Sequence, residues 1–206
     1  MKLKFCSLKI VILIAAASSC APFLLAQASV PAADTPSKSI QQAVTRFEDN
    51  LMALAQAMPA EKYNFAPAKD TFAAGSPAEF ATVRTFAQEL THVAAEPFRM
   101  LAPFGVTPDP GPDPKTFESL TAKEDILKAL QASFDYQNKV IATITPANAL
   151  TPAGPRGMTP VSALIAILND DGDHYGQMVE YLRMNGLIPP ATVRQQERMK
   201  RQPAAK

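Results

Sequence analysis

Two histidines and an aspartate are the residues of this chain whose types and spacing could do chemistry. The 206-residue sequence contains only two histidines, His92 and His174, so every imidazole-based site must use one or both. Asp170 precedes His174 by four positions, and this spacing places both side chains on one helix face, one turn apart. Such a pair can ligate one metal ion. If the helix that carries His92 faces this pair, two imidazoles and a carboxylate leave coordination positions open for water or substrate.

The row of residues that contains Asp170 and His174 indicates which way they face. Its members step by four and three, as one face of a helix does, and several of them are apolar. A carboxylate and an imidazole that face a core must be paired, hydrated or bound to a cation. The row therefore predicts either a metal site or a satisfied buried pair. Its members are Ala163, Ile167, Asp170, His174, Gln177 and Tyr181.

Other assignments of these residues remain open. A single histidine beside an apolar face is more often a hydrogen-bonded core residue than a ligand, and the acidic run of Asp170, Asp171 and Asp173 could form a solvated face. Asp171 could replace Asp170 as the ligand, since it lies three residues before His174. Glu89 and Glu96, near His92, are weaker ligand candidates. Tyr175, Gln177 and Tyr181 are candidates for positioning a substrate.

Two glycines flank His174 on the same predicted helix. Gly172 and Gly176 each cost about 1 kcal/mol relative to alanine inside a helix. Their presence suggests that a neighbouring backbone or a ligand approaches this face closely, although ordinary helix packing explains them equally well.

Four segments with the apolar spacing of amphipathic helices must position these residues. The first runs from Ile40 to Met58, with a Ser39–Gln42 capping box predicted at its start and Pro59 at its end. The second carries His92. It begins at Thr85, which forms a capping box with Gln88, and Pro97 is expected to kink or break it near Val93.

The other two helices follow a turn region at residues 107–114. The third begins with a predicted Thr121–Glu124 capping box. The fourth carries Asp170 and His174. It is capped by Thr159, with Pro160 at its first position, and it runs to about Asn185 with Gly186 as its stop. No period-2 run is long enough for a sheet, so the sequence predicts an all-α, four-helix bundle over residues 39–190, followed by a basic tail over residues 191–206.

The first 28 residues have the features of a secretory signal peptide. Lysines without acids precede an apolar run from Ile10 to Leu25, and the small residues around Ala28 form a cleavage site. The run is shorter than the ~20 residues that span a bilayer. Lipidation at Cys20 is the less favoured alternative, because the residues before it lack the usual leucine. The sequence therefore predicts cleavage after Ala28, a linker over residues 29–38 and a periplasmic or secreted protein.

Removal of this segment would change the composition. The net charge falls from +1 to −2, because three lysines and no acid are lost, and both cysteines, Cys6 and Cys20, leave with it. Cysteine proteases, thiol redox chemistry and cysteine-based zinc sites are then excluded. The charge also excludes a strongly basic nucleic-acid binder. No second segment is long enough to span a membrane. A homodimer is possible, but nothing in the sequence supports it.

Three segments of the sequence resemble the DinB-like (YfiT-like) metalloprotein superfamily, and the likeness extends over roughly residues 40–190. They are 58–67 (MPAEKYNFAP), 85–94 with its LTHVA motif, and 173–183 (DHYGQMVEYLR). The resemblance implies an up-down-down-up four-helix bundle that holds a divalent metal with one histidine on the second helix and a His-x-x-x-His pair on the fourth. His92 and His174 match two of these ligands, and Asp170 stands where the family has its third histidine. Aspartate can ligate zinc, nickel, manganese or iron, but as a harder ligand it changes metal preference, and the departure could also mark a lost site.

The resemblance also implies classes of reaction. Some relatives are metal-dependent transferases that act on low-molecular-weight thiols, and others are described as hydrolases. The expected function is therefore an exported metal-dependent hydrolase or thiol transferase acting on a small molecule that the sequence does not identify. The alternative is a non-catalytic extracytoplasmic bundle with a degenerate metal site. An Fe(II) oxygenase shares the ligand count of two histidines and one carboxylate, but the fold resemblance argues against it.

Overall fold

The computed structural model describes residues 34–68, 71, 75, 82–105 and 113–201 of the chain. The predicted signal peptide, the lipidation alternative at Cys20 and the first five residues of the predicted linker lie outside these residues. The helices and turns below all belong to one compact unit, Asp34–Lys206. Within the described residues, no helix is both long enough and apolar enough to cross a membrane.

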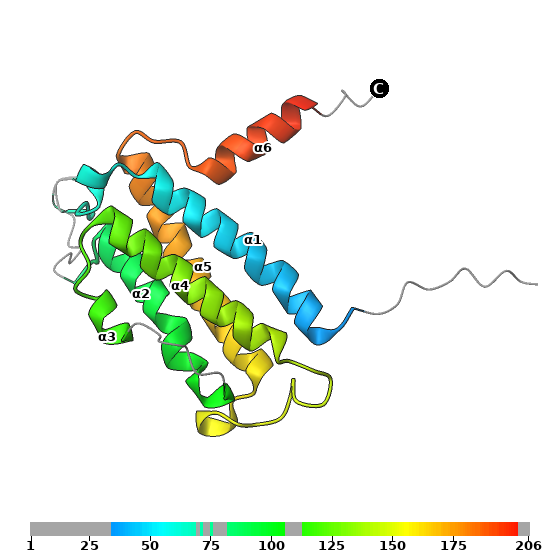
Figure 1. Cartoon of the computed structure of the whole chain (residues 1–206). Coiled ribbons are helices and arrows are strands. Elements are labelled where there is room, and N and C mark those ends of the chain that lie inside the picture. The colour runs from blue at the N-terminus through cyan, green and yellow to red at the C-terminus, as the bar shows by residue number, and fades with distance from the viewer. Residues whose placement is uncertain (1–33, 69–70, 72–74, 76–81, 106–112, 202–206) are drawn as a thin grey trace, which may run out of the picture. The chain divides into compact units, whose positions relative to one another are not determined.

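Four long helices build the unit, and none of the described residues lies in a strand. They are α1 (Pro36–Ala57), α2 (Phe86–Met100), α4 (Lys123–Ala142) and α5 (Pro160–Met184). In Figure 1, α1 and α5 run in one direction and α2 and α4 in the other, so the predicted up-down-down-up bundle is confirmed. The smaller elements are α3 (Pro114–Phe117), α6 (Pro190–Arg201) and the 3₁₀ turns η1 (Ala60–Lys62), η3 (Ala102–Phe104) and η4 (Pro155–Gly157).

The start of α1 differs from the prediction. The helix begins at Pro36, and Thr35 is its N-cap, because the Thr35 hydroxyl accepts a hydrogen bond from the Lys38 N–H at 3.2 Å. The predicted linker end at residue 38 and the predicted Ser39 capping box are therefore wrong. Pro36 favours this earlier start, since proline fits the first helical turn, where its missing N–H has no intrahelical partner to lose.

The capping box of α2 is confirmed, but the break at Pro97 is not. The Thr85 N–H donates to the Gln88 side chain at 2.8 Å, and the Gln88 N–H donates back to the Thr85 hydroxyl at 3.2 Å. The helix continues through Pro97 to Met100. Pro97 lies in the last turn, so it removes a hydrogen bond close to the helix end, and the Leu101 N–H still bonds to the Pro97 carbonyl at 2.9 Å.

The termini of the later helices follow the prediction in part. Thr159 caps α5 with Pro160 at its first position, and Gly186 follows with φ of 75°, as a helix stop requires. The predicted Thr121 capping box is wrong, because α4 begins at Lys123 and its N-cap, Ala122, has no side-chain bond. Pro114, predicted to lie in a turn, is instead the first residue of the short helix α3.

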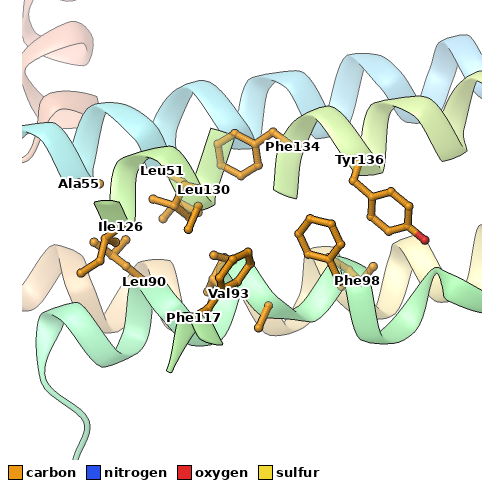
Figure 2. Packing of buried hydrophobic residues seen from close by; sticks show 14 of the residues in the cluster. Leu51, Ala55, Leu90, Val93, Phe98, Phe117, Ile126, Leu130, Phe134 and Tyr136 are labelled. Carbon is orange, nitrogen blue, oxygen red and sulfur yellow. The ribbon is translucent and has the colours of Figure 1, made fainter. Parts of the chain in front are cut away.

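The core between α2 and α4 holds α2 in a fixed orientation. Figure 2 shows Leu90, Val93 and Phe98 of α2 directed toward residues of α4. The ring of Phe98 stacks on Tyr136 of α4, with ring centroids 4.8 Å apart and an interplanar angle of 4°. This contact covers one side of α2, so His92, which lies beside that apolar stripe, is left to face α5.

Contacts between helix ends fix the helices lengthwise. The Lys123 ammonium at the start of α4 donates to the carbonyls of Gln56 and Met58 at the end of α1, each at 2.7 Å. The Tyr63 hydroxyl, after η1, donates to the Ala55 carbonyl at 2.8 Å, and the Ala87 N–H of α2 bonds to the Tyr63 carbonyl at 2.9 Å. These bonds set the register of α2, and with it the height of His92 in the bundle.

Candidate metal centre

The structure brings together the three side chains singled out from the sequence. α2 presents His92, and α5 presents Asp170 and His174 on one face. The Asp170 Oδ2 atom lies 3.4 Å from His92 Nε2 and 3.3 Å from His174 Nε2. One ligand atom from each of the three residues lies within 4.8 Å of the other two. In the described part of the chain, no other group of three His, Cys, Asp or Glu side chains is this close.

The cluster is buried on one side and accessible on the other. The His174 side chain is 7% exposed, His92 is 26% exposed and Asp170 is 44% exposed. The two imidazole rings meet edge to face, with centroids 4.7 Å apart and an interplanar angle of 67°. The site therefore has a dry inner wall at His174 and an outer side, at Asp170 and His92, that water or a small molecule can reach.

Two of the three distances between ligand atoms in the cluster match those around a divalent cation, and the third, between the two histidines, lies within 4.8 Å. Zinc binds histidine nitrogens and carboxylate oxygens at about 2.0–2.2 Å, and a tetrahedral arrangement at these lengths separates neighbouring ligand atoms by roughly 3.3–3.6 Å. The two separations from Asp170 Oδ2 are 3.4 and 3.3 Å. Three protein ligands would leave a fourth position for another group, as in catalytic rather than structural sites.

Glu89 supports the inner histidine from α2. Its Oε2 atom lies 2.6 Å from His174 Nδ1, and its side chain is only 2% exposed. A carboxylate at Nδ1 fixes the ring orientation and directs Nε2 toward a metal, as is usual for metal-ligating histidines. Glu89 was only a weak ligand candidate in the sequence, and the structure gives it this contact with His174.

The electrostatic environment favours neutral histidine at the outer position. Burial lowers the pKa of His92 below its usual value, and the positive charge of Arg84 lowers it further, followed by His174 and Arg99; Asp170 acts in the opposite direction. Only a neutral imidazole can offer a lone pair to a metal. Near neutral pH the His92 ring is therefore already in the form that binds.

Asp171, the alternative ligand, lies in a buried group of carboxyls that adjoins the cluster, because Glu96 of this group interacts with both Asp171 and Asp170. It is 4% exposed and shares a hydrogen bond with Glu96 of α2. Burial raises the pKa of Asp171 well above its usual value, and the neighbouring Glu96 and Asp170 charges raise it further. Burial also raises the pKa of Glu96 to about 7, with Asp170 contributing next. Both carboxyls therefore favour protonation, whereas a metal ligand must be ionised.

The residues proposed to position substrate have other partners in the structure. The Tyr175 ring packs edge to face on Phe47 of α1 at 5.9 Å. Gln177 donates to Asp173 on the surface of α5 at 3.0 Å. The Tyr181 hydroxyl donates to the Arg84 carbonyl at 3.2 Å, so Tyr181 alone of the three connects with a segment near His92.

In the part of the chain that the structure describes, no neighbouring helix packs closely against the two glycines beside His174. A Cβ atom added at Gly172 or Gly176 would meet nothing within 4 Å beyond the adjacent residues and backbone turns of its own helix. Close packing of a neighbour therefore does not require glycine at these positions, and nothing else in the structure explains them.

A comparison with known protein families found a match. A family model described as the DinB superfamily matches residues 43–178, about two thirds of the chain. The matched region includes α2, α4 and the part of α5 that carries Asp170 and His174, whereas α6 lies beyond it. No protein in a curated collection matches the chain.

Proposed function

This chain belongs to the DinB superfamily, and we propose that it binds one divalent metal ion through His92, Asp170 and His174. The observation that carries the proposal is the convergence of three ligand atoms, from two helices, to within 4.8 Å of one another. The buried Glu89 beside His174 Nδ1 supports it, because a metal-binding imidazole needs its second nitrogen held.

We further propose that the protein is an enzyme, either a hydrolase or a thiol transferase. A divalent cation held by these three residues would lower the pKa of a coordinated water or thiol and so supply a nucleophile near neutral pH. The uneven burial supports a reactive site, since Asp170 is 44% exposed and the open side admits a small molecule. The alternative is a non-catalytic bundle in which Asp170 simply pairs with the two histidines.

The donor set limits the metal without fixing it. Two imidazoles and one carboxylate suit zinc, nickel, manganese or iron, and the carboxylate makes the set harder than three imidazoles would be. Asp170 in place of a third histidine therefore shifts the preference toward metals that accept oxygen ligands, manganese and iron among them.

Export is part of the proposal and depends on the sequence of residues 1–28. Their lysines, apolar run and small residues before Ser29 support cleavage after Ala28. Mass spectrometry of the protein from its native compartment tests this, since cleavage leaves Ser29 as the first residue, and an intact Met1 in the exported fraction would contradict it.

Metal stoichiometry tests the proposed function. We expect the chain, purified without chelators, to carry or take up about one divalent ion, measured by elemental analysis after titration with zinc. The Asp173→Asn variant is the matched control and should take up the same amount of metal as the wild type. Asp173 lies on the same helix as Asp170, but its carboxylate bonds to Gln177. Failure of the chain to retain or take up any divalent metal would end the proposal.

Glu89→Gln tests the support of His174. The substitution keeps the size of the side chain but removes the charge at His174 Nδ1. We expect zinc affinity to fall by roughly 10- to 100-fold, the usual effect of losing such a partner, while the helical circular dichroism stays unchanged. Isothermal titration measures the affinity, and an unchanged affinity in Glu89→Gln would show that His174 is held without this carboxylate.

A further inference from the structure

A cavity of about 470 Å³ opens beside the candidate metal centre. His92 belongs both to the metal cluster and to the lining of this cavity, so a molecule in the cavity lies next to the cluster. The volume is in the range of small-molecule sites. The other lining residues come from the segment before α2, from α2 and from the end of α3, and most of them are polar: Thr82, Val83, Arg84, Gln88, Thr91 and Glu118.

Arg84 supplies the positive charge of this lining, and its backbone is anchored. Its carbonyl accepts the Tyr181 hydroxyl of α5, and the next residue, Thr85, is the α2 N-cap. The Arg84 charge reaches the site, because it adds to the effect of burial in lowering the pKa of His92 and opposes the burial that raises the pKa of Glu89. No described carboxylate forms an ion pair with Arg84 within 4 Å. Its guanidinium therefore keeps its donors for a ligand.

Gln88 adds a second donor to the same wall. Its side-chain oxygen is already used by the Thr85 N–H at 2.8 Å, so the amide oxygen is fixed and the NH₂ group remains available to donate. Arginine presents paired N–H donors that match the two oxygens of a carboxylate. The cavity wall thus combines a guanidinium and an amide NH₂, both of which favour an anionic oxygen group, with one of the metal-ligating imidazoles.

We propose that this cavity is the substrate subsite of the metal centre, and that it takes a small molecule whose carboxylate binds Arg84 while its reacting group lies at His92, Asp170 and His174. The inference rests on the proposed function, because it names the class of molecule that the same site accepts. Glu118, the C-cap of α3, also lines the cavity and repels anions, so Arg84 is the lining residue that attracts the carboxylate.

Two hydroxamates test the subsite in the full chain loaded with cobalt(II), whose visible absorption reports ligands on the metal. Both probes carry the same metal-binding group. One, the monohydroxamic acid of succinate, ends in a carboxylate, and the other ends in the neutral amide of the same length. We expect the carboxylate probe to bind about tenfold or more tightly, as a charge-assisted hydrogen bond predicts. Arg84→Gln should remove that preference, because the carboxylate probe loses a charge-assisted hydrogen bond and therefore loses more affinity than the amide probe.

Arg99→Gln is the matched control for charge alone. Arg99 is on α2, and its charge also lowers the pKa of His92, but it does not line the cavity. The preference for the carboxylate probe should survive in Arg99→Gln. Equal affinities for the two probes, or equal losses in both arginine variants, would overturn the subsite and leave the metal centre intact. Failure of the chain to take up cobalt would overturn the proposed function, and the subsite with it.

Discussion

The His92→Ala and His174→Ala variants are each expected to lose the stabilisation that zinc gives the wild-type chain. A metal at 100 to 1000 times its Kd stabilises a folded protein by about 3–4 kcal/mol. Each substitution removes one of three ligands, so each alone should abolish nearly all of this gain, and the double variant should lose no more than either single one. Chemical denaturation with and without zinc measures it.

Comparing the stability of these variants with and without zinc distinguishes one site shared by both histidines from two histidines that act independently. Without zinc, each substitution changes stability on its own, and His174→Ala should cost more, because it leaves the buried Glu89 without its partner at 2.6 Å. With zinc, the two changes act as one unit only if a single ion holds both rings. Zinc-dependent losses that simply add in the double variant would contradict the shared centre.

Glu48→Gln is expected to stabilise the protein at pH 8 by up to about 3 kcal/mol, and to have almost no effect near pH 4. Glu48 lies on α1 and is 8% exposed. Burial raises its pKa from 4.5 to about 7, against the opposing effect of the Asn138 side chain, while Asp49 and Asp135 raise it further. The folded protein therefore prefers the protonated acid.

The sign of this pH dependence follows from proton binding. Between pH 4.5 and about pH 7 the folded state keeps a proton on Glu48 that the unfolded state has released. Its contribution to stability is full below pH 4.5 and is lost as the pH rises through about 7. Glutamine carries no such charge and still offers one oxygen to Asn138, whose amide donates to both Glu48 oxygens at 3.2 and 3.3 Å.

Denaturation curves of the wild type and Glu48→Gln at several pH values check this prediction. Glu61→Gln is the control, since Glu61 is exposed and does not contribute to the raised pKa of Glu48, and its variant should show the same pH dependence as the wild type. A stability difference between Glu48→Gln and the wild type that stays constant from pH 4 to pH 8 would contradict the assignment of a raised pKa to Glu48.

Several features that depend only on neighbouring residues in the chain were predicted correctly, although the capping boxes at Ser39 and Thr121 were not. The caps at Thr85 and Thr159 use side chains three residues away, and the pairing of Asp170 with His174 uses one helical turn. Features that depend on other helices were not. α4 begins at Lys123 rather than after a Thr121 cap, and Lys123 is tied to the end of α1 by two carbonyls, a contact that no local pattern contains.

The same distinction applies to the candidate site. Placing His92 opposite His174 required the direction of α2 relative to α5, which came from the family resemblance and not from spacing. Glu89 is three residues from His92 but contacts His174, so its role depends on packing between helices. The burial of Glu48 could have been predicted from its spacing. It lies four residues after Val44 and three before Leu51, which are both fully buried, on the apolar row of the first helix.

A crystal structure of the zinc-loaded chain, with anomalous data collected at the metal edge, is the most direct measurement of the central claim. We predict one strong anomalous peak bonded to His92 Nε2, His174 Nε2 and a carboxylate oxygen of Asp170, with Glu89 retained at His174 Nδ1. A peak bound elsewhere, or an anomalous map with no density between these three side chains at saturating zinc, would contradict it.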